Sequence, residues 1–132
     1  MKKLIALLIS VSMLVCMSAC GKEESLPEGM SQELYDTSVK ALEIMDKYNN
    51  ADINAEEADD RLQAIYDKIE NMDLSDEPNK GEIWSEYERS LIITSMIISY
   101  KSALLSIKYD KKNTSDDIYT IADELRENLE LD

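Results

Sequence analysis

The chain lacks histidine and phenylalanine and has few helix-breaking residues. Its 132 residues include no His, no Phe, two Cys, two Pro and three Gly. Without His, the commonest general base, the commonest zinc ligand and the side chain that titrates near neutral pH are all missing. Three isolated glycines exclude a glycine-rich phosphate-binding loop. We therefore expect a protein that is not an enzyme and that holds no metal and no cofactor.

Basic residues are also scarce. The sequence has 14 Lys and Arg against 28 Asp and Glu, which gives a formal net charge of −14. Binding to nucleic acid needs clustered cations that release counterions from phosphate, so a nucleic-acid partner is not expected. An acidic surface favours basic partners, and we expect a basic protein or peptide.

The N-terminal segment has the anatomy of an export signal. Lys2 and Lys3 precede an uncharged run over residues 4–21, and small residues end that run, as in a secretory signal peptide. Its end, Met17-Ser18-Ala19-Cys20-Gly21, resembles the lipobox of bacterial lipoproteins. That resemblance implies that the signal is removed, that Cys20 becomes the new N-terminus, and that Cys20 is acylated. An uncleaved membrane anchor and cleavage without lipid are the alternatives.

The resemblance also sets the expected domain organisation and location. Residues 1–19 would be the signal peptide, residues 20–30 the lipidated Cys and a flexible tether, and residues 31–132 a helical domain. The lipid on Cys20 would hold the protein to the cell membrane on its extracytoplasmic side. With Cys16 removed and Cys20 acylated, the domain has no free thiol and no disulfide, so packing alone must stabilise it.

Hydrophobic periodicity over the remaining chain predicts an all-α fold. Apolar residues recur at alternating steps of three and four over residues 31–48 and 55–72, which places them on one face of a helix. Asn54 and Glu57 form a capping-box-like pair before the second helix. Two more helices are expected, over residues 82–109 and after residue 115. Short connections favour a small antiparallel bundle of about four helices.

The third predicted helix differs from the others. Residues 90–100, SLIITSMIISY, carry no charge, and a helix that is apolar nearly all round is packed on several sides. This helix should therefore be the long central one. A buried strand is the alternative reading, because the run is rich in β-branched residues. Eleven uncharged residues are too few to span a bilayer.

Two groups of residues are candidate partner-binding sites. One is the acidic cluster at the start of the second helix, and the other is an aromatic pair at helical spacing near the start of the third. The acids suit a helix N-terminus in solvent or a basic partner, and Trp and Tyr suit interface anchoring or the edge of a core. The residues are Glu56, Glu57, Asp59 and Asp60 in the cluster, and Trp84 and Tyr87 in the pair.

These observations lead to two hypotheses for function. The first is a membrane-anchored extracytoplasmic lipoprotein that acts as a helical interaction module for a protein or peptide. The alternative is a lipoprotein that binds a small ligand in a pocket between the third helix and its neighbours.

Overall fold

The computed structural model describes residues 25–109 and 115–131. In these residues it contains four helices and no strand: α2 (Gln32–Asn49), α3 (Ala55–Glu70), α4 (Glu86–Tyr109) and α5 (Ser115–Asn128). The all-α prediction is confirmed. The uncharged run 90–100 lies wholly inside α4, so the alternative of a buried strand is wrong.

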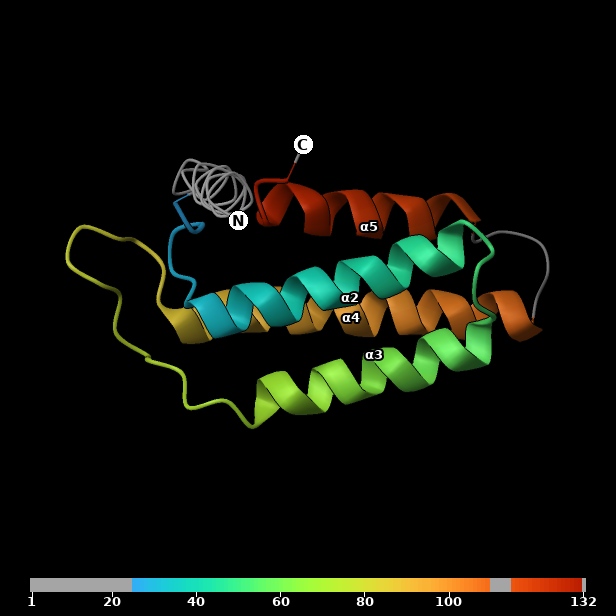
Figure 1. The fold of residues 1–132 in the computed structure, drawn as a ribbon, viewed down its shortest axis with the longest axis horizontal. Coiled ribbons are helices and arrows are strands. Elements are labelled where there is room, and N and C mark those ends of the chain that lie inside the picture. Colours follow the sequence, from blue (N-terminus) through green and yellow to red (C-terminus); the bar gives the residue numbers. More distant parts are fainter. Residues whose placement is uncertain (1–24, 110–114, 132) are drawn as a thin grey trace, which may run out of the picture.

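The helices run alternately in opposite directions, and α4 is the longest (Figure 1). Helix α4 contacts α2, α3 and α5, as expected of a helix packed on several sides. Helices α3 and α5 lie on opposite sides of the α2–α4 pair, and the C-terminal end of α4 extends beyond its neighbours (Figure 1). At 24 residues, α4 is about 36 Å long.

The core lies along the axis of the bundle and draws on every helix. The apolar positions that recur at steps of three and four on α2, α3 and α5 point inward, as their spacing predicts. Tyr100 and Ile97 from α4 are among the fully buried side chains. The other large, fully buried apolar residues are Leu34, Met45, Leu62, Ile69, Ile93, Leu104, Ile118, Leu125 and Leu129.

Polar side chains fix where α2 and α3 begin and end. The Asn54 side chain accepts a hydrogen bond of 3.0 Å from the Glu57 N–H, which caps α3 at the predicted position. Helix α2 ends in a turn in which the Asp52 N–H donates to the Lys47 carbonyl at 2.8 Å. Ala51 has a φ of 62° in this turn, a conformation in which glycine is usual. The sequence places Ala there at a cost in backbone strain.

Helix α4 begins at Glu86, later than the predicted residue 82. The Ser85 hydroxyl accepts a hydrogen bond of 3.2 Å from the Glu88 N–H, while the Glu88 carboxylate accepts one of 2.9 Å from the Ser85 N–H. This reciprocal capping box satisfies two N–H groups at the helix start. It also lowers the pKa of Glu88, chiefly through the hydrogen bond from the Ser85 backbone.

The last residues of the predicted tether belong to the packed body. Pro27, Gly29 and Met30 are buried, and the Arg89 Nε donates a hydrogen bond of 2.7 Å to the Glu28 carbonyl. A Cβ on Gly29 would lie 2.7 Å from the Trp84 carbonyl oxygen, so only glycine allows this approach. The expectation of a flexible tether up to residue 30 is therefore wrong for residues 27–30, because they pack against the segment before α4.

Candidate functional site

The acidic cluster does not form a single site. Glu57 pairs with Arg61 at 2.5 Å on the same helix, and Asp59 turns toward α4, where its Oδ1 lies 3.6 Å from the Lys101 Nζ. Glu56 and Asp60 are exposed to solvent. Within the described part of the chain, no three carboxylates lie close enough to hold a metal ion. Two of the four acids therefore serve the bundle itself.

The aromatic pair lies at the N-terminal end of α4 and is exposed. The Arg89 guanidinium carbon lies 5.6 Å from the centre of the Trp84 ring, a cation–π distance. Half of Tyr87 is accessible to solvent. Its backbone N–H donates a hydrogen bond of 3.0 Å to the Ser75 carbonyl in the α3–α4 connection. Both residues are therefore accessible near the start of α4, and Tyr87 lies at the start of a longer apolar row.

That row follows the side of α4 that none of the other described helices covers. We call it the outer face of α4 and define it by its exposed large apolar side chains. Leu91 is 50 % exposed, Ile98 52 % and Leu105 47 %, with Tyr87 and Tyr109 at the two ends. An isolated exposed Leu is ordinary, whereas several exposed apolar side chains along one face of a helix are typical of an interaction surface.

The outer face is also nearly free of charge. From residue 90 to residue 107, Lys101 is the only charged residue, and it lies at the edge of the face in its ion pair with Asp59. On α2 the exposed residues are, by contrast, mostly charged: they include Glu33, Asp36, Lys40, Glu43 and Lys47.

Among the described helices, α4 alone is long and apolar enough to cross a membrane. Its inner side supplies Ile93, Ile97 and Tyr100 to the bundle core. A core helix of a water-soluble domain passes the same test of length and composition, so this finding does not place α4 in a bilayer.

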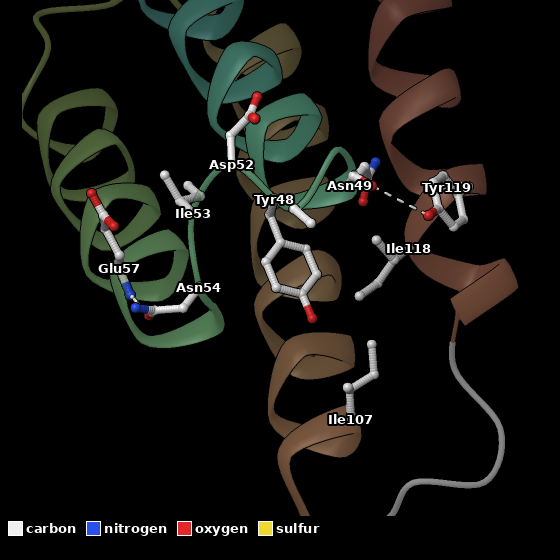
Figure 2. A pocket seen from close by; sticks show the side chains of 10 residues that line it. Tyr48, Asn49, Asp52, Ile53, Asn54, Glu57, Ile107, Ile118 and Tyr119 are labelled. Atoms are coloured by element: carbon white, nitrogen blue, oxygen red, sulfur yellow. Dashed lines mark hydrogen bonds between the residues drawn. The ribbon is translucent and has the colours of Figure 1, made fainter.

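A second candidate is a cleft of about 530 Å³ at the end of the bundle where α2 joins α3. Figure 2 shows that Tyr48, Ile107 and Ile118 come from three different helices and border the same space. The α2–α3 connection closes one side. The remaining lining residues are Asn49, Ala51, Asp52, Ile53, Asn54, Glu57 and Tyr119.

The cleft combines apolar walls with acceptors of hydrogen bonds. Two acids, Asp52 and Glu57, line it and no basic residue does, so a neutral or cationic ligand fits it better than an anion. The Tyr119 hydroxyl donates a hydrogen bond of 3.4 Å to the Asn49 carbonyl (Figure 2). The Asn49 side chain is held in place by the Tyr100 hydroxyl, which donates a hydrogen bond of 2.8 Å to its Oδ1.

Tyr100 is the most buried of the polar groups near the cleft. Its hydroxyl donates a hydrogen bond of 3.0 Å to the Met45 carbonyl, and its ring meets the Tyr48 ring edge to face, with ring centres 6.4 Å apart. Burial raises the pKa of Tyr100. The neutral hydroxyl is therefore a structural donor that ties α4 to the end of α2.

Comparison of the chain with protein-family models, with curated protein sequences and with solved structures finds no match. The predicted lipidation site, Cys20, lies outside the described residues. Sequence reasoning missed the outer face, although the spacing of seven between Leu91, Ile98 and Leu105 was a usable signal. It also missed the cleft, for which no local signal exists, because the lining residues come from separate segments.

Proposed function

We propose that this protein is a small extracytoplasmic lipoprotein, anchored to the cell membrane through Cys20, that acts as a protein-interaction module. The observation that supports this function most strongly is the outer face of α4. A bundle that needed only to remain folded would gain nothing from exposing Leu91, Ile98 and Leu105 to water. A protein partner that covered them would remove this apolar surface from solvent.

The acidic surface has a different role in this proposal. Exposed Glu56 and Asp60 would attract a basic partner over a range of only about 8 Å at physiological ionic strength. Such charges raise the rate of association more than the final affinity. A contact through the outer face should therefore persist in 0.5 M NaCl, whereas a contact through Glu56 and Asp60 alone should be lost.

Site-specific photo-crosslinking in cells tests the binding face. A benzophenone amino acid at position 91 should give a discrete crosslinked product from the full chain in its native membrane. The matched control carries the same group at Glu43, an exposed position on α2. Equal products from both positions, or none from position 91, would contradict the proposal.

The anchor has its own test. Cys20→Ser should abolish incorporation of labelled palmitate and should release the protein from the membrane fraction or leave an uncleaved precursor. Cys16→Ser is the matched control and should behave like the parent chain. Continued labelling of the Cys20→Ser variant would show that the lipobox reading is wrong.

A small-ligand carrier is the second candidate, and the cleft beside Tyr48 supports it. Its volume lies within the range of 300–1,000 Å³ that is usual for ligand sites. A ligand present at about 100 times its dissociation constant would stabilise the fold by about 2.7 kcal/mol. A thermal-shift screen of neutral and cationic small molecules should detect this, and an Ile107→Trp variant, which enlarges a partly exposed side chain in the cleft, should lose the shift.

A further inference from the structure

The apolar residues on the outer face of α4 are arranged symmetrically about Ile98. Leu91 and Leu105 lie seven residues before and after it, and Tyr87 and Tyr109 lie eleven before and after. At about 100° per residue, steps of seven and eleven both return to within about 20° of the starting direction. These side chains therefore form one straight row that reads Tyr, Leu, Ile, Leu, Tyr from either end.

We infer that the partner of the outer face is a second copy of this chain, packed with its α4 antiparallel about a two-fold axis at Ile98. This inference rests on the proposed function and names its partner. In an isologous contact, when one residue of the first copy meets a given residue of the second, the reverse contact also forms, and only a residue on the axis meets its own symmetry mate. Leu91 would meet Leu105 of the second copy, Tyr87 would meet Tyr109, and Ile98 would meet itself.

Charges at the ends of α4 favour the antiparallel direction. Glu86 lies twelve residues before Ile98 and Lys108 ten residues after it. On a helical projection both lie on the same side of the apolar row, Glu86 at roughly 120° and Lys108 at roughly 80° from its centre. Antiparallel packing brings Glu86 of one copy beside Lys108 of the other, twice. Parallel packing would place Glu86 of both copies at one end of the pair and Lys108 of both at the other, so these opposite charges would not meet.

The residues beside the row allow close approach of two helices. Thr94, Ser95 and Ser102 flank Ile98 with small side chains. A shallow groove between α4 and α5, also lined by small residues such as Ser99 and Ser106, runs along one side. From residue 90 to residue 107, α4 carries no acid, although Asp117 of α5 also lines the groove. Repulsion between two copies is therefore weak along the central part of the contact.

Cysteine crosslinking of the full chain in its own membrane tests both the partner and the direction. Two tagged chains, one with Leu91→Cys and one with Leu105→Cys, are produced together in a Cys16→Ser background and oxidised. We expect a disulfide between the two different chains. Neither variant alone should give a disulfide. In an antiparallel pair, position 91 of one copy lies about 21 Å along the helix from position 91 of the other, and the same holds for position 105. This distance exceeds the Cα separation of ~7 Å that a disulfide tolerates.

The possible results separate this inference from the proposed function. Self-crosslinking of Leu91→Cys alone would overturn the antiparallel arrangement. The absence of any disulfide, together with a photo-crosslink from position 91 to a different protein, would overturn self-pairing and leave the interaction function standing. The absence of both products would overturn both. The chain without a new cysteine controls for disulfides at Cys20.

A charge reversal provides an independent test. Lys108→Glu should reduce the yield of the Leu91–Leu105 crosslink roughly threefold to tenfold, because two ion pairs become two repulsive pairs. Adding Glu86→Lys to the same chain should restore the yield. Lys40→Glu on α2 changes the net charge equally and should have no effect. Equal losses with Lys108→Glu and Lys40→Glu would show that only net charge matters and would overturn the pairing.

Discussion

Ile97 and Ile98 are adjacent in the chain and belong to opposite surfaces. Ile97 is fully buried between the helices, whereas Ile98 is 52 % exposed on the outer face of α4. The same type of side chain therefore fills the core at position 97 and faces solvent at position 98. The contrast shows that the neighbouring helices cover the side of α4 that carries Ile97 and leave the side that carries Ile98 uncovered. The proposed interaction would give the uncovered apolar side a role.

The largest expected effect is the loss of stability on substitution of the buried Ile97. Ile97→Ala should lower the free energy of unfolding by about 2–5 kcal/mol, because it removes buried methylene groups and leaves a cavity. Ile98→Ala should change it by less than about 0.5 kcal/mol in a dilute sample, where chains are monomeric. Chemical denaturation followed by circular dichroism measures both. Similar losses for the two variants would mean that Ile98 is covered within the monomer.

A second substitution tests what positions the N-terminal end of the outer face. Gly29 has a φ of +74°, and an added Cβ would meet the Trp84 carbonyl. Gly29→Ala should therefore cost about 1–3 kcal/mol of stability. Gly81→Ala is the control, since Gly81 also has a positive φ but faces open space. If the two variants are equally stable, the close packing of Gly29 against Trp84 contributes nothing to the free energy of unfolding.

The polar contact on the inner side of α4 should have a smaller effect. Tyr100→Phe removes the hydroxyl that bonds the Met45 carbonyl, and we expect a loss of about 1–2 kcal/mol because a buried acceptor loses its donor. Tyr109→Phe, on the exposed outer face, should be neutral. Thermal unfolding of both variants checks this, and a neutral Tyr100→Phe would show that the hydroxyl does not tie α4 to α2.

The smallest effect concerns the cap at the start of α4. Hydrogen bonds from Ser85 lower the pKa of Glu88, so its charged form stabilises the fold above its ordinary pKa, near pH 4.5. That stabilisation disappears as the pH falls through the lowered value. Glu88→Gln should therefore be less stable than the parent at pH 7 and equal to it at pH 2. A difference that does not change with pH would contradict the capping role.

Much of the fold was predictable because the relevant signals are local. The periodic apolar positions of α2, α3 and α5 and the Asn54 cap predict these helices closely. The start of α4 was predicted too early because the Ser85–Glu88 capping box was overlooked. The left-handed Ala51 that ends α2 carries no signal, because the conformation is usually marked by glycine.

The outer face shows where periodicity stops being informative. A helix that is apolar nearly all round gives no indication of which sides its own chain will cover. Three neighbours cover α4, and the fourth side is left over because the chain has no further helix among the described residues to place there. The number and arrangement of packing partners is a property of the whole fold, which no window of sequence contains.

The packed residues 27–30 restrict how the bundle can sit on a membrane. If Cys20 carries the lipid, about seven residues link it to Pro27, and they span at most about 25 Å. Two copies held in one bilayer need their two-fold axis along the membrane normal. An antiparallel pair would then lie with its helices in the membrane plane, fastened at both ends of its length. Each cleft beside Tyr48 would then lie near the anchored end of the other copy.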